Sequence, residues 1–216
     1  MKYLVLDTET GGIGPDVSLL TVYLGVLDEN LNLLDELELF LKPNDGIYKT
    51  TAEALGINKI NLVEHEKKAV TYREGGTLLF QFLQKNSFVF QYIVPAGTDI
   101  VHIRYIGDLS MYKDIVQPIG STIDKLEPLG HNVAFDIIKI KDNLISEGSW
   151  LKFVSYRLLD TGTIGNFLKK KGKIPKEISG SLSSYCDHFK VDKTGAHDAK
   201  KDCEMTVAIF KEMLKL

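Results

Sequence analysis

Residues 2–12 read Lys-Tyr-Leu-Val-Leu-Asp-Thr-Glu-Thr-Gly-Gly, and this stretch decides the fold. An apolar run that ends in polar residues predicts a buried β-strand over Lys2–Thr8. Residues two apart on a strand share a face, so we expect the carboxylates of Asp7 and Glu9 to lie side by side where the strand ends. The glycines that follow leave backbone that another molecule can approach closely.

Two carboxylates on one patch repel each other unless a positive charge lies between them. A divalent cation meets that need, because Mg²⁺ and Mn²⁺ prefer oxygen ligands. An Asp-x-Glu pair is common by chance, and the alternative is an ordinary solvated strand end. The pair therefore predicts a metal site only if further acids join it.

A second acidic segment is Gly130–Asp136, which reads Gly-His-Asn-Val-Ala-Phe-Asp. A short strand is predicted to end at its glycine, and a helix is predicted over Asn132–Glu147 with Asn132 as a favourable N-cap. Asp136 would then lie on the first turns of that helix. By itself it could equally be an acid placed to suit the helix dipole.

A third acidic segment, Gly195–Asp202, leads into an amphipathic helix predicted over His197–Leu216. Asp202 lies on the helix, and His197 lies at its entrance. Histidine is suited to general-base work because its unperturbed pKa is about 6.5. The alternative is a surface histidine beside a lysine-rich first turn.

The rest of the chain alternates apolar runs with turn residues. Three strands followed by helices and one more strand predict a single α/β domain over residues 1–216 with a mixed sheet. A β-rich insertion is predicted at about 88–127, as a ribbon of residues 88–94 and 100–106 around a turn at 95–99. The other predicted elements are a hairpin of Ser18–Leu27 with Leu31–Leu41 and helices over Thr51–Leu62, Arg73–Gln84, Leu158–Lys171 and Ser181–Phe189.

The composition excludes few functions. With 216 residues, 44% of them hydrophobic and 25% charged, the chain has the make-up of a globular protein. It contains no apolar run near the roughly 20 residues that a membrane helix needs, and its first residues do not resemble a signal peptide. Two cysteines cannot form a disulfide framework, which favours the reducing cytoplasm. A net charge of −3 neither indicates nor excludes a nucleic-acid partner, since metal ions held by carboxylates can contact phosphates.

Together, Asp7-x-Glu9, His131-Asn132-x-x-Phe135-Asp136 and His197-x-x-x-x-Asp202 resemble the three motifs of the DEDDh branch of the DnaQ-like 3′→5′ exonucleases. Their order and spread along the chain also match. Leu159-Asp160-Thr161 and Gly180-Ser181-Leu182 look like the same family. The resemblance covers most of the chain outside about 88–127, and it implies a ribonuclease H-like three-layer fold.

The resemblance implies two-metal-ion hydrolysis of phosphodiesters from the 3′ end, with release of nucleoside 5′-monophosphates. His197 would be the general base that takes a proton from the attacking water. A tyrosine in its place would indicate the sister branch of the superfamily. The ligands of two cations, Mg²⁺ or Mn²⁺, would be Asp7, Glu9, Asp136 and Asp202.

The resemblance also implies a pocket for the terminal nucleotide. Its residues would come from the backbone after the first motif and from the second motif, namely Thr10, Gly11, Gly12, Asn132 and Phe135. Ile13 would join Gly12 as an apolar wedge under the last base, and His131 is either part of the pocket or structural. The candidates to meet the phosphate backbone are Lys139, Lys141, Lys169, Lys170, Lys171 and Lys173. The alternative for a lysine run at a helix end is a solvated face that suits the helix dipole.

Several alternatives stay open. Single-stranded DNA is the favoured substrate, and an exoribonuclease or oligoribonuclease-like RNA trimmer is the first alternative, because no residue decides how the 2′-OH is read. A non-catalytic nucleic-acid-binding module would lack a carboxylate or the histidine, and all five residues are present. The predicted insertion would guide substrate, dock a partner or join two copies, and substrate guidance is our hypothesis. Oligomeric state and a polymerase partner remain undetermined.

Overall fold

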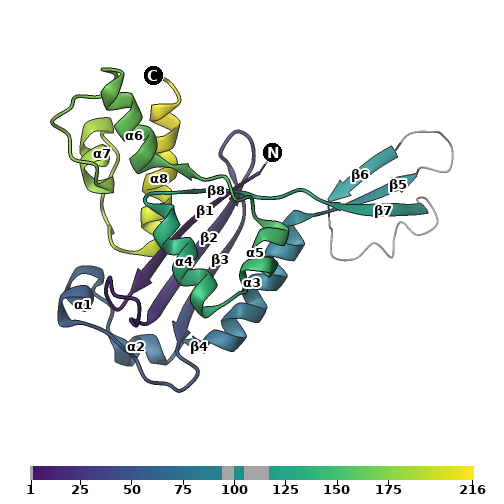
Figure 1. Ribbon diagram of the computed structural model, residues 1–216, viewed down its shortest axis with the longest axis horizontal. Helices are drawn as coiled ribbons and strands as arrows, with labels where there is room; N and C mark the ends of the chain where they lie inside the picture. Colours follow the sequence, from purple (N-terminus) through teal and green to yellow (C-terminus); the bar gives the residue numbers. More distant parts are fainter. Residues whose placement is uncertain (1, 94–99, 105–116) are drawn as a thin grey trace.

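The computed structural model describes residues 2–93, 100–104 and 117–216. Within these residues a six-stranded sheet has the order β4-β3-β2-β1-β8-β9 (Figure 1). β2 pairs antiparallel with both β1 and β3, whereas β8 runs parallel to β1 and to β9, and β4 runs parallel to β3. The predicted mixed sheet is therefore confirmed. Its strands are β1 (Tyr3–Thr10), β2 (Leu19–Leu27), β3 (Leu33–Lys42), β4 (Val70–Thr71), β8 (Glu127–Gly130) and β9 (Leu159–Asp160).

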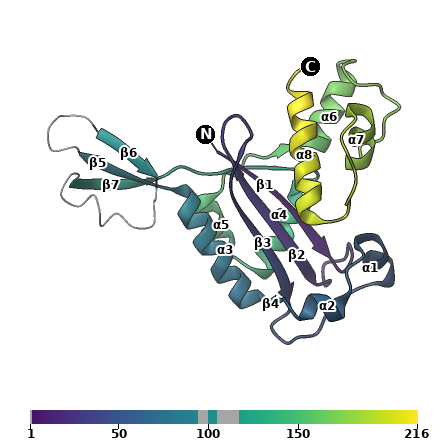
Figure 2. The same cartoon turned by 180° about the vertical axis from the view of Figure 1, so that it is seen from behind.

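Helices cover both faces of this sheet (Figures 1 and 2). Alternation along β1 sends Leu4 and Leu6 into a core with α3, α4 and α5, and sends Val5 into a separate core with α8. α6 and α7 pack beside α8, where Tyr185 is fully buried. The helices are α1 (Ala52–Asn58), α2 (Leu62–Glu66), α3 (Tyr72–Ser87), α4 (Val133–Asn143), α5 (Glu147–Phe153), α6 (Thr161–Lys170), α7 (Leu182–Phe189) and α8 (Ala199–Met213).

A second sheet forms an arm that projects from the domain between α3 and β8 (Figures 1 and 2). Its strands β5 (Phe88–Ile93), β6 (Ile100–Arg104) and β7 (Gln117–Ile123) have the order β6-β5-β7, and both pairings are antiparallel. The predicted ribbon is therefore present, with β7 as a strand that the sequence did not predict. The predicted turn at 95–99 lies outside the described residues.

The arm leaves the domain at the end of the sheet where β1 begins. Tyr3 pairs with Glu127, which follows the arm directly, whereas Glu9 lies six residues further along β1. At about 3.3 Å per residue, the root of the arm is roughly 20 Å from the acids at the other end of β1. This placement does not favour the hypothesis that the arm guides substrate to those acids.

Several predicted helices have different boundaries in the structure. Lys59 adopts a left-handed conformation with φ 57°, which ends α1 and separates it from α2 within the predicted Thr51–Leu62 helix. The helix predicted over Asn132–Glu147 ends at Asn143, and Ser146 caps a new helix, α5. Leu159–Asp160 pairs with β8 as a short strand. The helix predicted over Leu158–Lys171 therefore starts later, as α6 at Thr161. The start of such a helix depends on strand pairing with distant residues, which the local periodicity of the sequence does not reveal.

Within the described parts of the chain, none of the helices combines the length and the apolar character that crossing a bilayer requires. Cys186 and Cys203 are both buried free thiols.

Candidate metal centre and substrate site

Three carboxylates meet where β1 ends. Oxygens of Asp7, Glu9 and Asp202 all lie within 4.8 Å of one another. Asp7 and Glu9 share a face of β1 with Val5, which is the face that α8 covers, and Asp202 lies in the first turn of α8. The strand alternation and the position of this helix thus bring residues 195 positions apart in the sequence into one acidic group.

Asp136 reaches the same strand end from the opposite face of the sheet. It lies in the first turn of α4, is buried, and accepts a hydrogen bond of 2.6 Å from the Thr8 hydroxyl. It is outside the group of three carboxylates. Its charge nevertheless raises the pKa of Asp7, after the larger effect of burial. The four predicted ligands therefore lie around one strand end, three in a tight group and Asp136 beside them.

Burial shifts the pKa values of all four acids upward, and repulsion from neighbouring acids adds to the shift. Burial, followed by the charge of Asp202, raises the pKa of Glu9 to about 8. Burial raises the pKa of Asp136 to about 7 against the opposing hydrogen bond from Thr8, and burial also raises the pKa of Asp202. Such a group is costly to ionise alone, and a cation among the carboxylates would remove that cost.

His197 is tied to the acidic group through its backbone. Its N–H donates to an oxygen of Asp202 at 3.1 Å, and its φ of 69° places it in the left-handed region. The side chain is exposed and borders a pocket of about 260 Å³ that Glu9 and Asn58 also line. The histidine is thus at the edge of the acidic group and outside its tight core.

Asp198 is an acid of the site that the sequence reasoning missed. It is the N-cap of α8, accepting from the Lys201 N–H at 3.1 Å, and its charge contributes to the raised pKa of Asp7 and Glu9. The available signal was its position at the start of the helix predicted over His197–Leu216, where an aspartate suits the N-cap.

The loop after β1 is tightly held. Thr10 donates its hydroxyl to the Gly12 carbonyl at 2.6 Å, and Gly11 donates its N–H to Ser18 at 2.8 Å. A Cβ on Gly11 would collide with the Lys49 carbonyl, so a glycine is required there for packing. The Gly11 amide is therefore already bonded within the protein, and the residue contributes space beside the site.

Lys139 was predicted to meet phosphates, and this prediction is wrong. Its side chain is 5% exposed and donates to the carbonyl oxygen of Gly14 at 2.7 Å, which ties α4 to the loop after β1. That loop presents Ile13 at 91% exposure, and α4 presents Phe135 at 36% exposure. Two apolar side chains thus stand in solvent near the acids.

Asn132 stands at the N-cap position of α4, but its side chain makes no capping hydrogen bond. Its φ of 59° is left-handed. Asp160 performs the capping instead, accepting from Val133 N–H at 3.0 Å with one oxygen and from Thr163 N–H at 2.7 Å with the other. The Asp160 carboxylate therefore caps both α4 and α6. The Asn132 side chain, which does no capping, is exposed.

His131 has a structural environment. Its Nδ1 lies 2.9 Å from the Thr161 hydroxyl, and that hydroxyl donates to the Gly130 carbonyl at 3.2 Å. Burial lowers the pKa of His131, which favours the neutral ring. These contacts hold the turn between β8 and α4.

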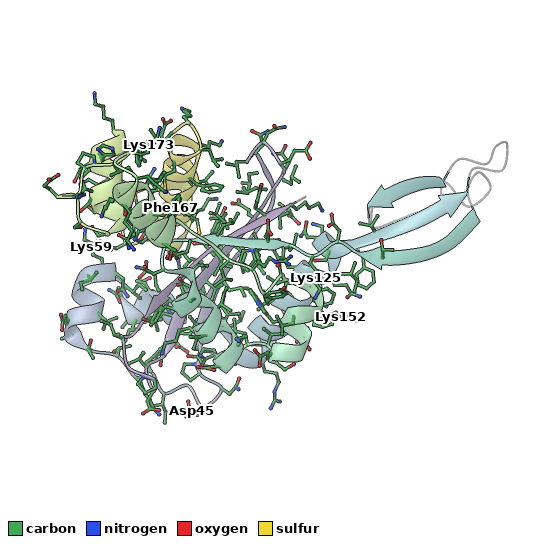
Figure 3. All side chains as sticks on the ribbon, turned by 45° about the horizontal axis from the view of Figure 1, so that its top comes forward. Asp45, Lys59, Lys125, Lys152, Phe167 and Lys173 are labelled. Carbon is green, nitrogen blue, oxygen red and sulfur yellow. The ribbon has the colours of Figure 1, made fainter. Side chains whose placement is uncertain are left out.

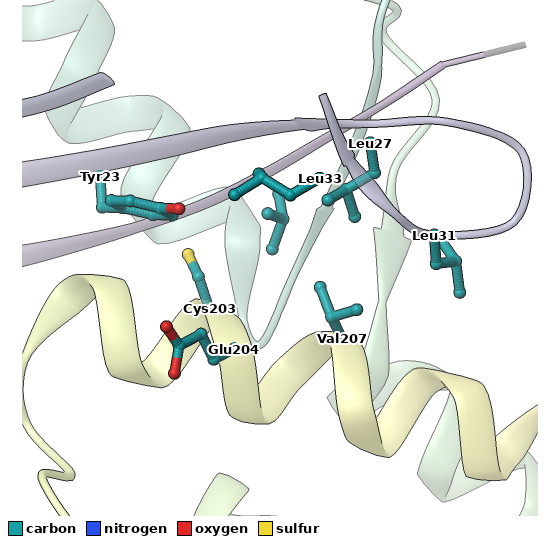
Figure 4. Close-up of a pocket in the computed structure, with 8 residues that line it drawn as sticks. Tyr23, Leu27, Leu31, Leu33, Cys203, Glu204 and Val207 are labelled. Carbon is teal, nitrogen blue, oxygen red and sulfur yellow. The ribbon is translucent and has the colours of Figure 1, made fainter. Parts of the chain in front are cut away.

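A separate groove of about 190 Å³ lies between α8 and the β2–β3 hairpin (Figure 4). Tyr23, Leu31 and Val207 line it, together with the buried thiol of Cys203. Glu204 is the acidic side chain among the lining residues. The groove lacks the converging acids of the strand end and is not the candidate site.

No protein-family model matches the chain, and no curated protein does. Its fold is similar to solved structures of exonuclease I from E. coli. The complex of that enzyme with a dT13 oligonucleotide has a TM-score of 0.66 and 17% identity, over 98% of this chain and 40% of the other. The zinc-bound form of its complex with single-stranded DNA has a TM-score of 0.66 and 17% identity, over 97% and 39%. A complex described as ExoI/SSB-Ct has a TM-score of 0.65 and 16% identity, over 99% and 41%.

This chain therefore spans about two fifths of the length of the structures that it matches. The likeness confirms the predicted fold class, a ribonuclease H-like arrangement of a mixed sheet between helices with a β-rich arm.

Proposed function

We propose that this chain is a metal-dependent 3′→5′ exonuclease that acts on single-stranded DNA and releases nucleoside 5′-monophosphates. The observation that carries the proposal is the meeting of Asp7, Glu9 and Asp202 within 4.8 Å, with Asp136 beside them. The motif resemblance and the fold similarity to exonuclease I support the same activity.

The acidic group suits divalent cations. Its donors are carboxylate oxygens, which Mg²⁺ and Mn²⁺ prefer, and their raised pKa values reflect burial without a neutralising charge. Asp7, Glu9, Asp136 and Asp202 would hold two ions. Bound cations would activate a water molecule and stabilise the charge that develops on the leaving oxygen.

The chain's own residues would perform the remaining steps. His197, exposed at the edge of the group, would take a proton from the attacking water. The hydrogen bond from its backbone N–H to Asp202 fixes the position of His197 relative to that proposed metal ligand. Ile13 and Phe135 would hold the terminal base between apolar surfaces, and the exposed Asn132 would contact the terminal nucleotide.

Single-stranded DNA is the favoured substrate because the exonuclease I structures similar to this chain hold single-stranded oligonucleotides. An RNA trimmer is the alternative of the same class, and a non-catalytic binding module is the alternative of a different class. Two buried free thiols suit a reducing compartment, and we propose a cytoplasmic location.

Digestion of 5′-labelled oligonucleotides tests the proposal. Matched DNA and RNA strands and a DNA duplex are incubated with Mg²⁺, with Mn²⁺ or with EDTA. We expect a ladder that shortens from the 3′ end of single-stranded DNA with metal only. Faster shortening of RNA would select the RNA trimmer, and binding without shortening would select the non-catalytic module.

A further inference from the structure

We propose that the exposed face of α6 binds the nucleotides upstream of the 3′ end, which makes it the entry track for single-stranded nucleic acid. This inference rests on the proposed function and adds a binding surface to it. The track is defined as Tyr156, Arg157, Phe167, Lys170 and Lys171.

A groove of about 400 Å³ connects the second motif to α6. Asn132 and Ala134 of the second motif form one wall, and Thr163 and Ile164 of α6 form another. The volume lies within the range of about 300–1,000 Å³ typical of ligand sites. Because Asn132 is a predicted contact of the terminal nucleotide, a strand leaving that position can enter this groove.

The track continues along one face of α6. Phe167 follows Thr163 by four residues, so both lie on the same side of the helix. Its ring is 57% exposed, and the Lys171 ammonium lies 5.5 Å from the ring centroid. An exposed aromatic ring beside a cation is the usual platform for an unpaired base and its phosphate.

A second pair of the same kind directly precedes the groove residue Leu158 in the sequence. Tyr156 is 72% exposed, and the Arg157 guanidinium lies 5.2 Å from its ring centroid. Leu158, the next residue, lines the groove itself. One pair of an aromatic ring and a cation is therefore next to Leu158 in the sequence, and the ring of the other pair lies one helical turn from Thr163.

Three of the lysines considered as phosphate ligands are already bound within the protein. Lys139 is bound to Gly14, Lys141 pairs with Glu147 at 3.1 Å, and Lys169 donates to the Ile178 carbonyl. Lys170 and Lys171, by contrast, are exposed, and neither takes part in an ion pair among the described residues. Figure 3 shows Phe167 on the α6 side of the domain, far from Lys152 near the arm.

The test compares Phe167→Ala and the double variant Lys170→Ala/Lys171→Ala with wild type on DNA of two and of twelve nucleotides. Lys211→Ala is the matched control, since Lys211 lies on α8 where its charge acts on Asp28. For the longer strand, KM should rise at least about fivefold in Phe167→Ala, the lower end of what one lost base–aromatic stack costs. In the double variant, the slope of log K against log salt should fall by about 1.4, or 0.7 for each lost phosphate contact.

For the dinucleotide, KM and kcat should stay at the wild-type values, and the control should match wild type for both substrates. Equal changes for the two lengths, or no change, would overturn the track. Binding of a labelled twelve-nucleotide strand in EDTA provides a readout without cleavage. One outcome is that the wild type binds the strand without cleaving it, while both track variants bind it more weakly than the wild type. That result would contradict the proposed activity and support the track. If the labelled strand does not bind, or binds equally to the wild type and all variants, the track is wrong. A protein would then be the candidate partner of this surface.

Discussion

The ammonium of Lys139 donates to the carbonyl oxygen of Gly14 at 2.7 Å and joins α4 to the loop after β1. The helix that carries Asp136 and Phe135 is thereby fixed to the loop that carries Ile13. Because the Lys139 ammonium is buried and already bonded to Gly14, it fixes the position of α4 against the loop and does not contact substrate.

Lys139→Met should therefore loosen the loop. A hydrogen bond from a charged group contributes about 1.5–3 kcal/mol, so Tm should fall by about 3–12 °C in a chain of this size. Hydrogen exchange of residues 11–17 should accelerate, and KM should rise more than kcat falls. Lys141→Met is the control on the same helix, where loss of a surface pair should shift Tm by about 4 °C at most. Equal effects of the two substitutions would contradict the role of Lys139.

Metal-free protein should lose stability as pH rises. The pKa of Glu9 is raised from 4.5 to about 8, so its favourable contribution is present below pH 4.5 and is lost as pH rises through 8. Thermal unfolding in EDTA between pH 5 and 9 measures this change. Glu9→Gln should flatten the profile, and Mg²⁺ should raise Tm more at pH 8 than at pH 5. A profile of unchanged slope in Glu9→Gln would show that Glu9 is not the group responsible.

Asp160→Ala should weaken two helix N-termini at once. Each lost cap costs about 0.5–2 kcal/mol, so the combined loss is about 1–4 kcal/mol. Denaturant unfolding measures it. Ser146→Ala, which removes the single cap of α5, is the comparison. A loss no greater than that of Ser146→Ala would argue against the double cap.

The sequence predicted most of the framework and the acids. Alternation along β1 was sufficient to place Asp7 and Glu9 together, because a strand has a fixed period. The partners of buried cations could not be predicted in this way. Lys139 and Lys171 look alike in the sequence, yet one is buried against Gly14 and the other is exposed beside Phe167. The capping of α4 by Asp160 could not be predicted either, because Asp160 and Val133 are brought together only by the pairing of β8 with β9.

Removal of the arm should leave the proposed nuclease activity intact. Phe88 and Ile123 are paired across β5 and β7, so an Asn-Gly turn can replace residues 89–122. Because the arm leaves the far end of the sheet, cleavage of a twelve-nucleotide DNA strand should keep its KM and kcat. A marked loss of processivity or a changed length preference would restore the guidance hypothesis.

The most direct test of the central claim compares wild type with Asp7→Asn on one 5′-labelled single strand of DNA. Asparagine keeps the size of the side chain and removes the charge from the acidic group. With Mg²⁺ or Mn²⁺, the wild type should shorten the strand from its 3′ end, and Asp7→Asn should be slower by at least about 100-fold with an unchanged far-ultraviolet circular dichroism spectrum. A rate in Asp7→Asn within about threefold of wild type would contradict a metal-dependent nuclease centred on this strand end.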